Sequence, residues 1–345
     1  MEVLAETKGG IGWITLNRPK ALNALSYGMV TEIEKLLLAW KEQEDIAVVC
    51  LQGAGEKAFC AGGDIRSLYD RRDDRIVEFA SPYFQTEYRM DELIYHYPKP
   101  ILVFMDGLVM GGGVGISYGA SHRIITEKTR WAMPEMTIGF FPDVGASYFL
   151  NQMPGVYGRY FALTAETILP PDILLVGAAD YYVQHEKVEK LKQELQTIDW
   201  KSKEPLALVD GLLERYGEKG PIDSSLEQRE AQINQHFSKE TVEGIVESLA
   251  RAAESGDDWA KAQLNTLQDK SPTSLKVTLE QLKRGQGKSL SDCFGMEWKM
   301  ALNFMQNHDF FEGVRALLVD KDRQPHWKPA TLEEVTEEMV AGYFK

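Results

Sequence analysis

The chain has 345 residues, more than one compact core usually holds, so we expect two domains or one large domain with an appended region. Its 44% hydrophobic and 26% charged residues are typical of a soluble globular protein, and no apolar run approaches the roughly 20 residues of a membrane span. The net charge of -14 works against nucleic-acid binding, because contact with phosphate chains depends on a surplus of lysine and arginine. We therefore expect neither a membrane nor a nucleic acid as a partner.

The first predicted elements are a hairpin and a capped helix. Residues 2–6 and 11–16 alternate like two strands around a glycine turn. Ser26 is predicted to cap a helix whose apolar side chains, from Met29 to Trp40, fall on one face. The apolar run IAVVCL at 46–51 has the length and composition of a buried strand.

Strands and helices continue to alternate through the next part of the chain. A long helix is predicted over 76–97, where Pro98 and Pro100 end it, and a shorter helix over 113–121. Predicted strands share an apolar, β-branched or aromatic character and lie at 101–105, 123–126 and 131–133. This alternation predicts an α/β fold built from repeated ββα units.

From about residue 186 the strand signal almost disappears. We therefore expect a core over 1–185 and a helical C-terminal region over 186–345, with its clearest loop at 217–221. The helices predicted in this region show apolar residues at helical spacing and cover 187–197, 239–253, 257–268, 274–283, 290–307 and 332–343.

The three cysteines, Cys50, Cys60 and Cys293, have neither CxxC spacing nor the Cys/His spacing of a metal site. An odd cysteine count of this kind indicates free thiols in a reducing compartment. The N-terminal stretch shows no signal or transit peptide. Together these features predict a cytoplasmic protein.

Two glycine-rich loops, FCAGGD and MGGGVG, each follow a predicted strand and leave backbone N–H groups open to a ligand. Two such donors, from Ala61 and Gly112, would form an oxyanion hole if they pointed at one atom. The simpler interpretation of each loop is a tight turn. Dinucleotide binding is disfavoured, because the GxGxxG spacing is not met.

The stretch MPEMTIGFFPDVG places two carboxylates, Glu135 and Asp143, among apolar residues, glycine and proline. Acidic side chains are rarely buried unless they are paired or used, so both are candidates for chemistry. The structural alternative is that Glu135 caps a turn and Asp143 starts a helix.

A competing motif is GISYG, in which Ser117 fits the G-x-S-x-G elbow of serine hydrolases. That elbow needs the serine at the sharp turn between strand and helix. Three glycines already make the turn here, so Ser117 is expected inside the helix as a small packing residue.

The succession ITLNRPKALNALS, KAFCAGGDI, KPILVFMDGLVMGGGVGIS and AMPEMTIGFFPDVGASYFL resembles the crotonase (enoyl-CoA hydratase/isomerase) superfamily, in the order found in that family. Its members bind acyl-CoA thioesters and stabilise an enolate or a tetrahedral oxyanion. The resemblance implies a crotonase-like spiral core of repeated ββα units with an α-helical C-terminal region. CoA would enter as part of the substrate, and neither a cofactor nor a metal is implied.

Within the superfamily, PDVGASYFL and the C-terminal DFFEGVRALLVDKDRQPHWKPATL are similar to the branch that hydrolyses 3-hydroxyisobutyryl-CoA in valine catabolism. A hydratase needs a second glutamate two residues after the glycine triplet, where this chain has Gly115. The family's usual glycine eight residues after Glu135 is replaced by Asp143. Thioester hydrolysis is therefore favoured over an enoyl-CoA hydratase or isomerase, a serine thioesterase, and a non-enzymatic acyl-CoA-binding scaffold.

The resemblance also implies roles for particular residues. The thioester oxygen would sit between the N–H groups of Ala61 and Gly112, and Glu135 would act either as nucleophile or as base for water. Asp143 would hold the 3-hydroxyl of the substrate or orient water, and Glu87, otherwise an ordinary exposed helix residue, would contact the substrate. Contacts to CoA, mostly through the backbone, are implied for Lys20, Ala21, Leu22, Ala61, Gly63, Asp64 and Ile65.

Three further expectations concern a helix cap, the acyl pocket and the oligomeric state. Asp64 on its own is a helix cap for the segment that begins near Ile65. The walls of the acyl pocket are sought among aromatic residues that could equally be core: Tyr83, Trp131, Phe140 and Phe141. Superfamily members often form trimers, so a homo-oligomer stays among the expectations.

Overall fold

The computed structural model describes residues 1–72, 75–217 and 223–345, so the predicted loop at 217–221 lies outside the described residues from residue 218 on. The chain forms two compact units, and each unit is assembled from three separate segments. Unit 1 consists of Met1–Asp64, Thr86–Trp131 and Ile168–Ser225, and unit 2 of Ile65–Gln85, Ala132–Thr167 and Leu226–Lys345. This division differs from the expected boundary after residue 185.

Unit 1 contains a six-stranded sheet in the order β1-β2-β3-β5-β7-β9. β1 and β2 form the predicted antiparallel hairpin, with Val3 paired to Leu16, and all later neighbours pair in parallel. The strands are short: β1 (Val3–Lys8), β2 (Ile11–Leu16), β3 (Val48–Gly53), β5 (Ile101–Met105), β7 (His122–Ile125) and β9 (Tyr181–Tyr182). The inner strands β2, β3, β5 and β7 are mostly buried, whereas the edge strand β1 is exposed beyond Val3.

A second, three-stranded sheet runs in the order β4-β6-β8, with β4 (Ala58–Cys60), β6 (Leu108–Met110) and β8 (Arg130–Ala132). Each of its strands follows a strand of the large sheet in sequence. A helical segment then follows each pair: α2 (Ile65–Asp70) and α3 (Ile76–Tyr95), α4 (Gly112–Tyr118), and the 3-10 segment η2 (Glu135–Ile138). This is the expected repetition of ββα units, and it puts a glycine-rich loop directly after β4 and after β6.

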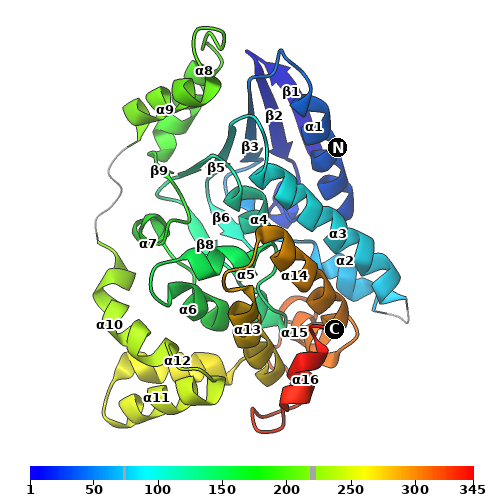
Figure 1. The fold of residues 1–345 in the computed structure, drawn as a ribbon, viewed down its shortest axis with the longest axis vertical. Helices are drawn as coiled ribbons and strands as arrows, with labels where there is room; N and C mark the ends of the chain where they lie inside the picture. Colours follow the sequence, from blue (N-terminus) through cyan, green and yellow to red (C-terminus); the bar gives the residue numbers. More distant parts are fainter. Residues whose placement is uncertain (73–74, 218–222) are drawn as a thin grey trace. The chain divides into compact units, whose positions relative to one another are not determined.

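Helices cover both faces of the large sheet (Figure 1). On one face lies α1 (Tyr27–Lys41), which the side chain of Ser26 caps as predicted by accepting a hydrogen bond from the Met29 N–H at 3.2 Å. Only glycine fits at position 12, because a Cβ there would lie 2.4 Å from the ring of Trp40.

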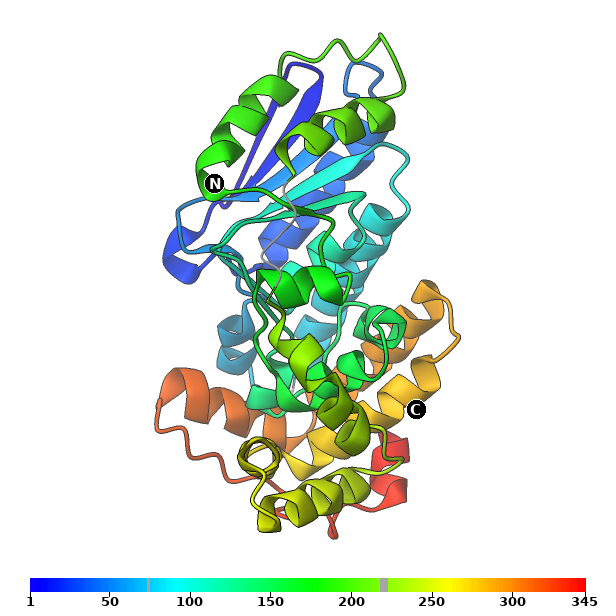
Figure 2. The ribbon, with the colours of Figure 1, turned by 90° about the vertical axis from the view of Figure 1, so that its left-hand side faces the viewer.

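The opposite face of the large sheet is covered by α8 (His185–Leu195) and α9 (Pro205–Tyr216), as Figures 1 and 2 both show. Apolar residues of these helices, including Leu191 and Leu212, share one buried cluster with Ile11, Trp13 and Phe104 of the sheet. The first two helices of the expected C-terminal region therefore belong to unit 1, because the sheet would otherwise expose this apolar face to water.

Helices make up most of unit 2. Those predicted near 239–253, 257–268, 274–283, 290–307 and 332–343 are present, whereas the helices at 225–237 and 308–314 were not predicted. Beyond β9, the described residues contain helices and no strand. These helices are α10 (Ser225–Phe237), α11 (Val242–Glu254), α12 (Asp258–Gln268), α13 (Pro272–Gly285), α14 (Leu290–Phe304), α15 (His308–Val314), the π-helical segment η4 (Arg315–Val319) and α16 (Glu337–Gly342). Among the described residues, none of the helices combines the length and apolar character needed to cross a bilayer.

The remaining short helices complete the list. Unit 1 has η1 (Pro19–Ala21) and α7 (Pro170–Leu175), and unit 2 has α5 (Ala146–Phe149), η3 (Leu150–Gln152) and α6 (Tyr157–Thr164). The predicted strand at 46–51 begins two residues later than expected, at Val48, and the predicted helix at 113–121 ends at Tyr118.

Candidate active site

The loop after β4 does not offer the amide that the sequence analysis selected. The Ala61 N–H donates to the carbonyl of Leu22 at 3.0 Å. Leu25 then pairs with Gly63, since the Leu25 N–H donates to Gly62 O and the Asp64 N–H donates to Leu25 O, each at 2.8 Å. The expected role of Ala61 as an oxyanion donor is therefore corrected: its N–H already has a backbone acceptor.

The Gly63 N–H is the donor that this loop leaves open. Gly62 has a φ of +110°, a conformation that favours glycine, and it turns the backbone between Ala61 and Gly63. Successive N–H groups of an extended strand point to opposite sides, so the pairing of Asp64 with Leu25 directs the Gly63 N–H away from Leu25. Within residues 1–72, 75–217 and 223–345, the Gly63 N–H has no hydrogen-bond acceptor.

Gly112 lies beside this donor. It is the first residue of α4, so its N–H is not used inside the helix, and the described residues supply no other acceptor for it. A Cβ on Gly112 would lie 3.3 Å from the Gly63 nitrogen, and a Cβ on Gly62 would lie 3.8 Å from the Gly112 nitrogen. Unit 1 therefore brings two backbone amides, Gly63 and Gly112, to one place.

A buried acid of α3, Glu87, adjoins the Gly112 amide. The Glu87 Oε1 atom would lie 2.7 Å from a Cβ on Gly112. Only 2% of Glu87 is exposed, so Glu87 is not an ordinary exposed helix residue. Asp91, one helical turn later, is also buried and was missed by the sequence analysis. Its spacing of four residues from Glu87, on one helix face, was the available signal.

The thiol of Cys60 is buried, and the charges of these two acids act on it. Burial raises its pKa to about 12; the hydrogen bond with the Gly62 backbone opposes this, and the charges of Glu87 and Asp91 add to it. All three cysteines are buried and free, as predicted. Cys60 is a packing residue under the loop.

Ser117 lies inside α4, as predicted. Its hydroxyl donates to the carbonyls of Gly113 at 2.8 Å and Val114 at 3.0 Å, and the residue is buried. It therefore does not occupy the exposed turn that a nucleophile elbow requires. Gly115 lies in the same helix, at the position where a hydratase has its second glutamate.

The residues expected to contact CoA are partly gathered in unit 1. Leu22 follows η1, and its carbonyl holds the 61–64 loop through Ala61. Asp64 accepts an ion-pair hydrogen bond from Arg18 at 2.9 Å, a contact that its expected role as helix cap did not include. Lys20 and Ala21 are exposed in η1, while Ile65 opens α2 and belongs to unit 2.

In unit 2, Glu135 opens the segment η2 and is buried, with 7% exposed. Its turn closes when the Phe140 N–H donates to the Glu135 carbonyl at 3.2 Å, and Gly139 ends η2 with a φ of +65°. A Cβ on Gly139 would lie 2.5 Å from the Asp309 carbonyl, so this turn packs directly on α15. The C-terminal helices therefore support the segment that carries Glu135.

Asp143 is also buried in unit 2, with 6% exposed, in the turn before α5. Two buried side chains that the sequence analysis missed, Gln281 of α13 and Glu297 of α14, bond to this turn. Only the fold could reveal them, because they lie more than 130 residues away in sequence.

The four aromatic residues considered as pocket walls are all buried core residues. Phe140 contacts the rings of Phe84, Phe141, Phe304 and Phe310 at centroid distances between 4.5 and 6.1 Å. Packing of this kind stabilises the segment between the two acids rather than forming an open wall.

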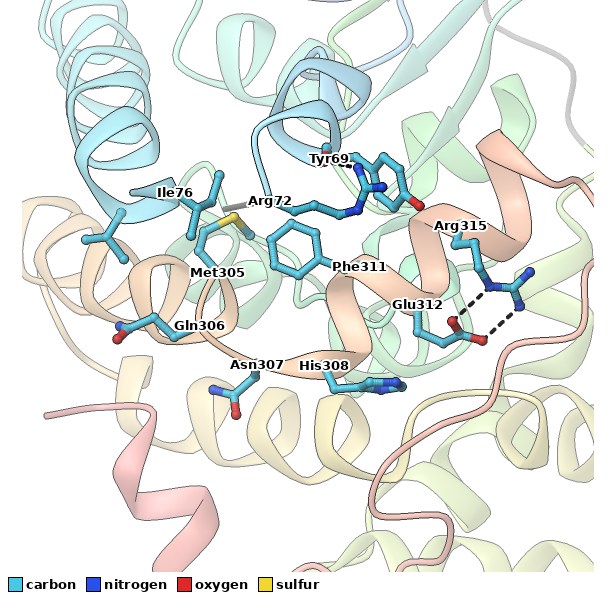
Figure 3. Close-up of a pocket in the computed structure, with 11 residues that line it drawn as sticks. Tyr69, Arg72, Ile76, Met305, Gln306, Asn307, His308, Phe311, Glu312 and Arg315 are labelled. Atoms are coloured by element: carbon cyan, nitrogen blue, oxygen red, sulfur yellow. Dashed lines mark hydrogen bonds and ion pairs between the residues drawn. The ribbon is translucent and has the colours of Figure 1, made fainter. Parts of the chain in front are cut away.

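Unit 2 also has a cavity of about 650 Å³ that contains none of the predicted site residues (Figure 3). Its arginines already have partners. The Arg72 guanidinium lies 4.1 Å over the Tyr69 ring, and Arg315 pairs with Glu312 at 2.8 Å and with Asp320 at 2.7 Å. Across the described residues, no group of three or more His, Cys, Asp or Glu side chains is placed to hold a metal ion.

Known proteins are similar to this chain over almost its whole length. A family model described as enoyl-CoA hydratase/isomerase matches residues 11–344. A Gallus gallus protein named "3-hydroxyisobutyryl-CoA hydrolase, mitochondrial" is 43% identical over 350 residues, which cover 100% of this chain and 89% of that protein. The Homo sapiens protein of the same name is 42% identical over 348 residues, covering 100% of this chain and 88% of that protein.

Solved structures agree on the fold. A carnitinyl-CoA dehydratase from Mycobacterium thermoresistibile has a TM-score of 0.92 at 38% identity, covering 100% of this chain and 96% of that chain. An enoyl-CoA hydratase from Rhodobacter sphaeroides 2.4.1 has a TM-score of 0.89 at 34% identity, covering 100% and 97%. The expected crotonase-like fold is confirmed.

One expectation is overturned by these comparisons. The sequence analysis predicted a cytoplasmic protein, but the curated relatives carry names that place them in the mitochondrion. The cytoplasmic prediction was wrong because free thiols indicate only a reducing environment, which does not single out the cytosol.

Proposed function

Because this chain belongs to the enoyl-CoA hydratase/isomerase family, we propose that it hydrolyses the thioester of a short 3-hydroxyacyl-CoA, with 3-hydroxyisobutyryl-CoA of valine catabolism as its substrate. The observation that carries this proposal is the pair of open amides, Gly63 and Gly112, next to a helix in which residue 115 is glycine. The pair supplies oxyanion stabilisation, and the glycine removes the second acid of a hydratase.

In this mechanism the thioester carbonyl oxygen accepts hydrogen bonds from the Gly63 and Gly112 N–H groups. Attack on the carbonyl carbon moves negative charge onto that oxygen, where the two donors are strongest. Removal of one donor from such a site typically costs about 10²–10³ in rate, so this contribution dominates.

Glu135 promotes the attack on the thioester carbonyl carbon by one of two routes. It either attacks the carbonyl carbon itself and forms a mixed anhydride, or it takes a proton from the water that attacks. In both routes the C–S bond breaks and CoA leaves as a thiolate that is then protonated. Water supplies the oxygen of the acid product, either directly or when it hydrolyses the anhydride.

The other acids serve the acyl group. Asp143 accepts a hydrogen bond from the 3-hydroxyl of the substrate, and Glu87 contacts the substrate beside Gly112. The backbone of residues 20–22 and of Gly63, Asp64 and Ile65 contacts CoA. No cofactor takes part, since CoA is the leaving group.

The test offers the purified protein 3-hydroxyisobutyryl-CoA and crotonyl-CoA in parallel, with free thiol and enoyl absorbance as the two readouts. Thiol release from 3-hydroxyisobutyryl-CoA, together with an unchanged enoyl absorbance of crotonyl-CoA, supports the hydrolase. Loss of the enoyl absorbance without thiol release overturns it.

The second candidate is a hydratase or dehydratase, and the names of two similar solved structures favour it. A hydratase has its second glutamate at the position where this chain has Gly115. This candidate therefore requires another acid in that role. Crotonyl-CoA hydration by the wild-type protein that both Glu135→Gln and Glu87→Gln abolish would identify Glu87 as that acid.

A further inference from the structure

The turn that carries Asp143 has an unfavourable backbone conformation. Val144 has a φ of +51° and Gly145 a φ of +90°, both in the left-handed region. A β-branched residue there is an outlier, because its Cβ crowds the backbone. Such a conformation persists only where the surroundings hold it, and it is found preferentially at functional sites.

Glu297 holds the C-terminal half of this turn. Its Oε2 accepts from the Gly145 N–H at 2.7 Å and its Oε1 from the Ser147 N–H at 2.8 Å. Glu297 is fully buried, and among the described residues it has no cation as a partner. A buried acid without a cation is costly, so backbone N–H groups are what this side chain serves.

Gln281 holds the N-terminal half. Its Nε2 donates to the Pro142 carbonyl at 2.6 Å and to the Ser147 hydroxyl oxygen at 2.9 Å. It is also fully buried. The helix that carries it comes so close to the turn that a Cβ on Gly285 would lie 2.4 Å from the Ser147 carbonyl oxygen. Two C-terminal helices thus bond to the turn on both sides of Asp143.

We propose that Glu297 and Gln281 are positioning residues, which fix the Asp143 carboxylate for the 3-hydroxyl of the substrate by holding the strained turn at 142–147. The inference rests on the proposed role of Asp143. It gives the C-terminal helices α13 and α14 a part in substrate selection, although neither residue touches the substrate. The charge of Asp143 also acts on Glu297, where burial is the main cause of a raised pKa.

The test compares 3-hydroxyisobutyryl-CoA with isobutyryl-CoA, which lacks the 3-hydroxyl. Glu297→Gln replaces one of the two accepting oxygens by an NH₂ group. This NH₂ group faces the backbone N–H of Gly145 or Ser147 and cannot accept from it, so the turn loses one hydrogen bond. We expect the preference for the hydroxylated ester, as a ratio of kcat/KM values, to fall about tenfold or more, because small misplacements have large effects on rate. The slow hydrolysis of isobutyryl-CoA should change little.

The matched control is Glu280→Gln, on α13 beside Gln281, where the acid pairs with Arg284 at 2.7 Å on the helix surface. It should leave both rates unchanged. If Glu297→Gln does not fold, Gln281→Met is the second variant, and it should lower the preference in the same way. An unchanged preference in a folded variant of either residue overturns the inference.

A double-mutant cycle separates positioning from a general loss of structure. If Glu297 acts through Asp143, Glu297→Gln has little further effect on the preference in an Asp143→Asn background. Independent, multiplicative effects of the two substitutions would contradict the proposal.

Failure of the proposed function is distinguishable. If the wild-type protein releases no thiol from either ester, the hydrolase proposal fails, and calorimetric dissociation constants for the two esters replace the rates. Tighter binding of the hydroxylated ester that Glu297→Gln abolishes supports the inference. Equal binding of both esters by the wild type, or a difference that survives Glu297→Gln, overturns it.

Discussion

Replacing Gly112 by alanine puts a methyl group beside the proposed oxyanion hole. The new Cβ would lie 2.7 Å from the Glu87 Oε1 and 3.3 Å from both the Gly63 nitrogen and the Leu25 Cδ1. It would therefore fill space next to the two amides that the thioester oxygen needs. The oxygen can then no longer reach both donors at hydrogen-bond distance.

The loss of rate and the change in stability should differ greatly. Loss of one donor to the oxyanion predicts a fall of about 10²–10³ in kcat/KM, equivalent to ~3–4 kcal/mol of transition-state stabilisation. The same substitution changes folding much less. Alanine is favoured over glycine in a helix by at most about 1 kcal/mol, and crowding costs about 1–3 kcal/mol in the opposite direction. The Glu87 side chain can shift to relieve part of that crowding.

The assay is thiol release from 3-hydroxyisobutyryl-CoA together with urea unfolding of the same samples. The control is Gly295→Ala on α14, where a Cβ would meet no atom within 4 Å. We expect it to raise stability by about 0.4–1 kcal/mol and to leave the rate unchanged. A Gly112→Ala protein that keeps more than about a third of its kcat/KM would show that the carbonyl oxygen does not bind beside this amide.

Three further predictions follow. Glu135→Gln should lower kcat by about 10²–10⁴, measured as thiol release, and near wild-type kcat would remove Glu135 from the mechanism. Ser117→Ala should change kcat less than about twofold, because the hydroxyl donates to the helix carbonyls of Gly113 and Val114, whereas inactivation would restore the serine thioesterase. Burial raises the pKa of Glu297 to about 8, so the folded state retains a proton that the unfolded chain releases. Stability should therefore fall between about pH 5 and pH 8 by up to ~1.4 kcal/mol per pH unit relative to Glu297→Gln, and parallel curves for the two proteins would refute this.

Much of unit 1 could be predicted because its signals are local. Ser26 caps its helix through a residue three positions away, and the hairpin at its start pairs neighbours in sequence. Ser117 was correctly expected inside a helix, since the glycines before it already make the turn. Glycine-rich loops after buried strands marked where a ligand could approach the backbone.

The choice of amide could not be made in the same way. Ala61 and Gly63 lie two residues apart in one loop, and only the φ of +110° at Gly62 and the pairing with Leu25 decide which N–H is open. Glycine at position 62 permits this φ but does not require it, and the pairing with Leu25 has no signal in the residue types of the loop. An isolated pairing of this kind depends on two loops that meet only in the folded chain.

The support of the acids was missed for a different reason. Glu297 and Gln281 are polar residues in helices, and helical polar residues usually face solvent. Their bonds to the 142–147 turn span 134 to 152 residues of sequence. The same limit applies to α8, which was predicted although its packing on the large sheet was not, and α9 beside it was not predicted at all.

The most direct test of the oxyanion hole is a crystal structure with a ketone analogue of 3-hydroxyisobutyryl-CoA, in which a methylene group replaces the sulfur. We predict that its carbonyl oxygen lies about 2.7–3.1 Å from both the Gly63 and the Gly112 nitrogens. A carbonyl oxygen bound by the Ala61 N–H, or beyond hydrogen-bond distance of either glycine, would contradict the account.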